Sequence, residues 1–126
     1  MKGKYPRKIG HWVGDKEIIP SGKFFDKDNP ANGEIIAKVA RGDARDAEKA
    51  IRAAEATRKL WAATPVIKRA DLIREIVFKL KEKRAELAEI ISLELGKSLK
   101  NALAEIDAAA ECGFFFAGEG RRFYGE

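Results

Sequence analysis

The sequence predicts an α+β chain, with an N-terminal β-hairpin and strand followed by three or four long α-helices. Up to residue 41, short apolar runs rich in β-branched residues are separated by Gly, Pro and Asn turn signals. From Gly42 onward, apolar residues recur every three or four positions, which is the period of a helix. The 126 residues fit one domain and are expected to form a single segment, with a β-rich region over 1–41 and a helical region over 42–126.

Turn signals divide the β-rich region into its expected strands. Residues 9–13 predict a short apolar strand, residues 14–15 a turn, and residues 17–20 the returning strand of a hairpin. Residues 29–33 predict a second turn, because a glycine at its end takes a positive φ at little cost. Residues 34–40 then predict a further strand, and the segment between the hairpin and the second turn is assigned no element.

Capping signals mark the starts of the first two helices. Asp43 is a good N-cap for a helix that ends near residue 63. Thr64 and Pro65 predict the next start, with threonine as cap and proline at the first helical position, where its missing N–H costs nothing. Arg84 interrupts the apolar stripe that follows, which predicts two helices, or one bent helix, joined near residues 83–84. The apolar stripe of the first helix consists of Ala47, Ala50, Ile51, Ala54 and Trp61.

The run from Gly96 to the end predicts one long last helix. Gly96 ends the preceding helix in a left-handed conformation, and Ser98 caps the new one. Phe114, Phe115 and Phe116 follow one another without a break, and successive helical residues point about 100° apart, so the three rings cannot share one face. We therefore expect an interface at these rings, the alternative being an ordinary core. Small residues that allow close backbone approach cover most of the helix before them: Ala102, Ala104, Ala108, Ala109, Ala110, Gly113 and also, just after them, Ala117.

Charge and hydropathy make nucleic-acid and membrane partners unexpected. The net charge is +5, but a phosphate-tracking surface would cluster basic residues among aromatics, whereas here acidic and basic residues alternate. No apolar run approaches the ~20 residues of a membrane span, and the N-terminus lacks the apolar core of a secretory signal, so a cytoplasmic location is expected. The many Lys, Glu and Arg residues are a pattern of thermophile proteins. Pairs expected along the helices are Glu75–Lys79, Lys83–Glu86 and Arg84–Glu89.

The residues most able to carry chemistry do not form a site in the sequence. His11 is the only histidine and Cys112 the only cysteine, so no histidine-based metal site, catalytic pair or internal disulfide is expected. Gly118-Glu119-Gly120 resembles a fragment of a phosphate-binding loop, but no predicted strand precedes it. The residues alone therefore assign no catalytic, cofactor-binding or metal-ligating residue, and they predict a non-catalytic chain.

Several segments, in order, resemble the N-terminal portion of the aldehyde dehydrogenase superfamily. Residues 10–13 are similar to the family's opening G-x-W hairpin, and residues 29–37, NPANGEIIA, match its NPATGEVIA turn and strand nearly residue for residue. Residues 118–122 are similar to the corresponding residues of the family's semialdehyde-oxidising branches. The resemblance covers nearly the whole chain. Further similar segments are DAEKAIRAA at 46–54, WAATP at 61–65, RADLI at 69–73, LAEIISLELGKS at 87–98 and AGEGRRFYGE at 117–126.

The resemblance implies an activity whose residues lie outside this sequence. Family members oxidise aldehydes to acids with NAD or NADP, through a thiohemiacetal on a cysteine, with an asparagine at the oxyanion and a glutamate as general base. In the family these residues and the nucleotide-binding turn follow the matching segment, so none is carried over, and Cys112 does not match the nucleophile. Some members hold a monovalent cation with an acid on the last helix, where this chain has Ile106, with Glu105 one step away.

Two functions from different classes therefore remain open. The first is the front part of an aldehyde dehydrogenase, inactive alone and forming the outer layer of the cofactor-binding domain, where the three phenylalanines would pack on the rest of the enzyme. The second is a non-enzymatic helical module that associates with itself, as a dimer or larger, or with another protein.

Overall fold

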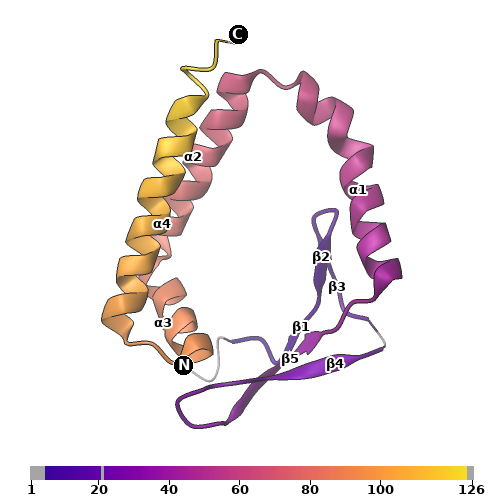
Figure 1. The fold of residues 1–126 in the computed structure, drawn as a ribbon, viewed down its shortest axis with the longest axis vertical. Coiled ribbons are helices and arrows are strands. Elements are labelled where there is room, and N and C mark those ends of the chain that lie inside the picture. Colours follow the sequence, from indigo (N-terminus) through magenta and orange to yellow (C-terminus); the bar gives the residue numbers. More distant parts are fainter. Residues whose placement is uncertain (1–4, 21, 125–126) are drawn as a thin grey trace. The chain divides into compact units, whose positions relative to one another are not determined.

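The computed structural model describes residues 5–20 and 22–124, in which five strands precede four helices (Figure 1). The α+β class and the order of strands before helices are as predicted. Two compact units are distinguished, residues 1–61 and residues 62–126. Their border falls inside the first helix, α1 (Ala44–Ala63), whereas strands give way to helices between Ala40 and Ala44. The organisation of the chain as a single segment stays a prediction.

The first unit contains a three-stranded sheet and a separate hairpin. Strand β5 (Ile35–Ala40) is central in the sheet, parallel to β1 (Lys8–Ile9) and antiparallel to β4 (Phe24–Asp28). Strands β2 (His11–Val13) and β3 (Lys16–Ile18) form the hairpin. Strand β4 is not predicted from the sequence, because charged residues occupy three of its five positions.

The strand predicted over residues 9–13 is divided at Gly10. The backbone N–H of Gly10 donates to Glu17 Oε1 at 2.7 Å, and a Cβ at this position would lie 2.5 Å from the Ile18 carbonyl oxygen. Such close approach excludes any side chain at Gly10. The chain therefore passes from β1 in the sheet to β2 in the hairpin, so one predicted strand becomes two strands of different sheets.

Helix α1 begins at the predicted cap. Asp43 Oδ1 accepts hydrogen bonds from the backbone N–H groups of Arg45 (2.8 Å) and Asp46 (3.2 Å), and the N–H of Asp43 donates to Asp46 Oδ2 at 3.3 Å. This reciprocal pattern is a capping box, which satisfies donors at the helix start. The cap predicted at Asp43 is confirmed.

The second unit consists of α2 (Val66–Glu82), α3 (Arg84–Leu95) and α4 (Leu99–Glu119), with α4 packed against both α2 and α3. The break between α2 and α3 lies at Lys83, as predicted. Pro65 occupies the cap position of α2, one residue later than predicted. Gly96 has a φ of 69°, and Ser98 Oγ accepts from the Asn101 N–H at 3.2 Å, so both predicted signals between α3 and α4 are confirmed.

The last helix is shorter than predicted. It ends at Glu119, and a turn follows in which the Arg121 N–H donates to the Gly118 carbonyl at 3.2 Å. Among residues other than proline, glycine is the least favourable in a helix interior. The glycines at 118 and 120 therefore weaken the last turn. Residues 125 and 126, included in the predicted helix, lie outside the described residues.

Helices α2 and α4 approach so closely that glycine is required at their contact. A Cβ placed on Gly113 would overlap Val77 Cγ2, and one on Gly120 would overlap the Ala70 side chain. The small residues on α4 therefore permit close backbone approach, as predicted. The core of this unit is made of small side chains in consequence, and no large side chain of the described residues is fully buried. Its buried residues are Ala70, Val77, Ala88, Ala102, Ile106, Ala110 and Ala117.

Candidate interaction surface

The three consecutive phenylalanines of α4 have different surroundings. Phe114 is half-buried, with its ring edge-on to Phe78 of α2 at a centroid distance of 5.4 Å and with Lys81 Nζ 5.6 Å from the ring centroid. Phe115 and Phe116 remain 61% and 58% exposed, and their rings lie edge-on to each other with centroids 5.4 Å apart. The rings thus do not share one face.

Helix geometry explains this difference. At about 100° per residue, Phe115 points almost directly away from the side of α4 that carries Ile106 and Ala110, which are buried. Phe114 and Phe116 lie on the two flanks of that buried side, and the flank of Phe114 meets Phe78 of α2. That Phe114, Phe115 and Phe116 form an interface stays a prediction, and its geometric premise is present in the structure.

Many large apolar side chains of the described helices are exposed. On α2 they include Ile76 (65%) and Phe78 (58%), and on α4 they include Phe115 and Phe116. An apolar surface of this extent is typical of a protein that packs against something else.

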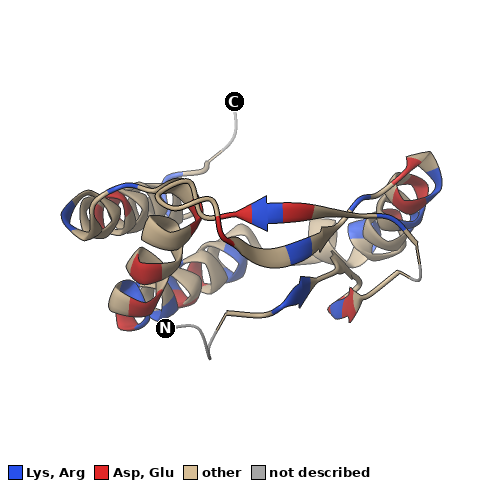
Figure 2. Cartoon of the chain, turned by 90° about the horizontal axis from the view of Figure 1, so that it is seen from below, with Lys and Arg blue, Asp and Glu red and all other residues tan. Residues whose placement is uncertain are grey.

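Ion pairs fix the helices of the second unit beneath this surface. Arg84 donates from Nε and Nη2 to the two carboxylate oxygens of Asp107, each at 2.6 Å. The pair predicted between Arg84 and Glu89 is therefore wrong, because the guanidinium reaches across to α4 rather than along its own helix. The predicted pair of Lys83 with Glu86 is present at 3.7 Å. Figure 2 shows acidic and basic residues interspersed along the helices, in agreement with a mixed-sign surface.

The pair of Arg84 and Asp107 makes stability depend on pH. The hydrogen bonds from Arg84 lower the pKa of the Asp107 carboxyl, so the unfolded chain binds this proton more readily than the folded one. The stabilisation is present above the usual aspartate pKa of about 3.9 and is lost as pH falls through the lowered folded value. We expect Asp107→Asn to lower the urea midpoint at about pH 7, and this difference to shrink as pH falls below the usual aspartate pKa.

Circular dichroism across a pH series measures that difference. Glu86→Gln, which removes only a longer contact to Lys83, is the matched control and should change the midpoint little at any pH. An Asp107→Asn deficit that is equally large at pH 2 and pH 7 would contradict the assignment.

Residues that could carry chemistry are dispersed over the described part of the chain. Within that part, no three His, Cys, Asp or Glu side chains are grouped in a way that could hold a metal ion. Cys112 is an exposed free thiol on α4, Ile106 is buried on the same helix, and the Glu105 carboxylate is paired with Lys97. The helices that are described include none long and apolar enough for a membrane crossing.

Comparison with known proteins matches this chain to one family. The profile of the aldehyde dehydrogenase family matches residues 18–126. Malonate-semialdehyde dehydrogenase from Halalkalibacterium halodurans is 38% identical over 112 residues, which are 88% of this chain and 23% of that enzyme. The crystal structure of lactaldehyde dehydrogenase from Escherichia coli has a TM-score of 0.89 at 32% identity, over 94% of this chain and 25% of that one.

A putative methylmalonate-semialdehyde dehydrogenase from Sinorhizobium meliloti, solved in complex with NAD, has a TM-score of 0.85 at 32% identity, over 90% of this chain and 23% of that one. The chain spans about a quarter of the length of the proteins that it matches. Because the family profile covers most of its residues, this chain belongs to the aldehyde dehydrogenase family and corresponds to the N-terminal part of its enzymes.

Proposed function

We propose that this chain is the N-terminal segment of an NAD(P)-dependent aldehyde dehydrogenase that oxidises a semialdehyde to the carboxylic acid. The observation that carries the proposal is that similarity covers nearly all of this chain but only about a quarter of its relatives. The malonate-semialdehyde dehydrogenase relative favours a semialdehyde substrate, and the complex of the S. meliloti protein favours a nicotinamide cofactor, NAD or NADP.

The segment contributes packing to such an enzyme rather than chemistry. Its sequence assigns no catalytic, cofactor-binding or metal-ligating residue, so by itself it is expected to be inactive. Phe115 and Phe116 form the proposed interface with the remainder of the enzyme, and Phe114 anchors its inner edge against Phe78. Burial of an aromatic ring contributes about 2 kcal/mol, so two exposed rings supply a substantial part of a stable contact.

The experiment compares the isolated chain with a chimera in which it replaces the matching residues of the H. halodurans enzyme. The chimera is expected to oxidise malonate semialdehyde and to form NADH. The isolated chain should form no NADH and give no saturable heat with NAD or NADP. A folded but inactive chimera would contradict the proposed function, and saturable cofactor binding by the isolated chain would contradict its inactivity.

The exposed rings also favour a second candidate, a non-enzymatic helical module that associates with its own copy. Two such helices could cover Phe115 and Phe116 of each other through a symmetric contact. If the chain is such a module, the chimera need not be active. The same experiment therefore separates the two candidate functions.

A further inference from the structure

Asn32 is the one asparagine of this chain that precedes a glycine. The sequence contains no glutamine and three asparagines, and Asn29, Asn32 and Asn101 are followed by proline, glycine and alanine. The family motif NPATGEVIA has threonine where this chain has Asn32, so the Asn-Gly pair does not come from that motif. Asparagine is among the least heat-resistant residues of proteins, because its side-chain amide can be lost. The residue that follows it decides how readily this happens.

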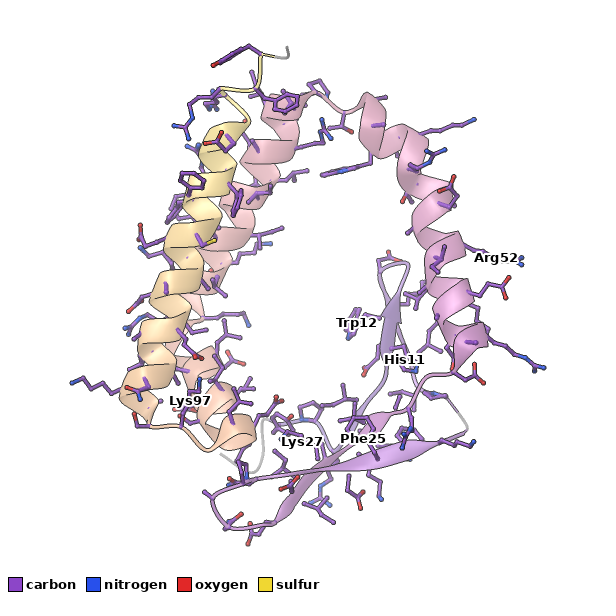
Figure 3. All side chains as sticks on the ribbon, in the orientation of Figure 1. His11, Trp12, Phe25, Lys27, Arg52 and Lys97 are labelled. Atoms are coloured by element: carbon purple, nitrogen blue, oxygen red, sulfur yellow. The ribbon has the colours of Figure 1, made fainter. Side chains whose placement is uncertain are left out.

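The Asn-Gly pair lies in the turn that joins β4 to β5. Asn32 and Gly33 are both exposed to solvent, and Gly33 has a φ of 70°. Beyond its chain neighbours, no atom of the described residues lies within 4 Å of the position that a Cβ on Gly33 would take. In Figure 3 the turn extends beyond Lys27, on the side away from Phe25. Water therefore reaches the side-chain amide of Asn32 and the backbone nitrogen of Gly33.

Hydrogen bonds within the turn act on both of these groups. The Gly33 N–H donates to the Asn29 carbonyl at 2.7 Å, and this bond holds the proton on the nitrogen. The Glu34 N–H donates to Asn32 Oδ1 at 3.0 Å, which polarises the side-chain carbonyl and would stabilise negative charge on Oδ1. The folded turn thus activates the side-chain carbon Cγ as an electrophile, while one hydrogen bond restrains the nitrogen that could attack it.

We propose that Asn32 is a site of spontaneous deamidation, and that the hydrogen bond from Gly33 to Asn29 controls its rate. When this bond opens, the Gly33 nitrogen loses its proton and forms a bond to Asn32 Cγ. The Cγ–Nδ2 bond breaks, and ammonia leaves with that proton, which closes a succinimide ring. Water then opens the ring at either carbonyl and gives aspartate or isoaspartate. The net exchange is water for ammonia, without oxidation or reduction, and it does not depend on the proposed function.

The other two asparagines each lack a requirement of this reaction. Asn29 is followed by Pro30, whose nitrogen carries no proton, so the ring cannot close in the same way. Asn101 is also exposed, but the next residue, Ala102, is buried in α4, and its N–H donates to the Ser98 carbonyl at 3.0 Å. Both are therefore internal controls for a measurement on the wild-type chain.

Peptide mapping by mass spectrometry, after incubation at mildly alkaline pH, is the first test. The tryptic peptide of residues 28–38 contains both Asn29 and Asn32, and its fragment ions locate the converted residue. Asn32 is expected to be converted at least about tenfold faster than Asn29 or Asn101, and at least about tenfold faster again in urea than in the folded chain. Conversion of Asn32 no faster than that of Asn101 would overturn the site. Equal rates with and without urea would overturn control by the hydrogen bond.

Gly33→Ala in urea tests whether the backbone nitrogen is the attacking group. Alanine would be strained at a φ of 70° in the folded turn, and unfolding removes that strain from the comparison. The new Cβ hinders approach of the nitrogen to Asn32 Cγ, so conversion should slow at least about tenfold. An unchanged rate would show that water attacks the side chain directly, and it would overturn the ring closure.

Isoaspartate is expected to disturb the hairpin of β4 and β5, because it adds a carbon to the main chain of the turn. At the base of the turn the Asn29 N–H donates to the Glu34 carbonyl at 2.9 Å, and the added carbon changes that span. In chain purified with isoaspartate at position 32, amides of β5 should exchange at least about threefold faster than in wild type. Asn32→Asp, which adds the same charge without the extra carbon, is the matched control and should exchange as wild type does. Equal exchange in these two chains would overturn the expected disturbance.

Discussion

Replacing Gly113 by valine is expected to abolish cooperative unfolding of the unit formed by α2, α3 and α4. A Cβ at Gly113 overlaps Val77 Cγ2, and Val77 is buried on the facing helix with little room to move. Overpacking by single methylenes typically costs about 1–3 kcal/mol, and valine adds three carbons at the point of closest helix approach. A unit of some 65 residues has little stability to lose. Urea titration followed by circular dichroism measures the effect.

A control on the same helix separates this clash from helix propensity. Glycine is normally unfavourable in a helix, so its replacement should stabilise the chain where space is available. At Gly118 the nearest neighbour of a new Cβ is the flexible end of Arg122, at 3.7 Å. Gly118→Ala is therefore expected to be neutral or to stabilise by about 0.5–1 kcal/mol. Wild-type unfolding of the Gly113→Val variant would show that α2 and α4 do not touch at this point.

The isolated chain is expected to sediment as a dimer or larger species at high micromolar concentration, and Phe115→Asp to convert it to a 14.0 kDa monomer. Phe115 and Phe116 leave two adjacent rings in water, and each forgoes about 2 kcal/mol of burial. Association of α4 with its copy covers both rings. A charge placed at Phe115 opposes this contact but leaves the folded unit intact, because its side chain points away from the buried side of α4. Sedimentation over a dilution series gives the mass.

Phe114→Asp is the matched variant one residue earlier. The Phe114 ring is half-buried against Phe78, so its loss should destabilise the helical unit rather than dissociate an oligomer. A wild-type chain that remains a monomer at every concentration would contradict the self-association prediction. If Phe114→Asp converted the oligomer to a folded monomer, Phe114 rather than Phe115 would be the ring at the contact between the copies.

Features determined by neighbouring residues were predictable from the sequence. The Asp43 cap, the left-handed Gly96 and the Ser98 cap each depend on hydrogen bonds within a few residues. The break near Arg84 was predictable because it disrupts a periodic stripe. At the candidate surface, helical periodicity alone showed that Phe114, Phe115 and Phe116 must diverge.

Features determined by distant residues were not predictable in this way. Gly10 divides a strand because Glu17 and the Ile18 carbonyl lie against it, and neither contact leaves a signal at Gly10 itself. Arg84 pairs with Asp107 rather than with Glu89 of its own helix because α3 packs against α4, which is a property of the packed unit. Which phenylalanine turns inward depends likewise on Phe78, a residue of another helix.

The small-residue core between α2, α3 and α4 also determines how the chain responds to temperature. The heat-capacity change of unfolding grows with the apolar area that unfolding exposes to water, and buried alanines contribute little of it. We therefore expect a flat stability curve for the isolated chain, with little tendency to cold denaturation. Burial of Ile76, Phe115 and Phe116 against a partner would add to that heat-capacity change and make the stability curve more strongly curved.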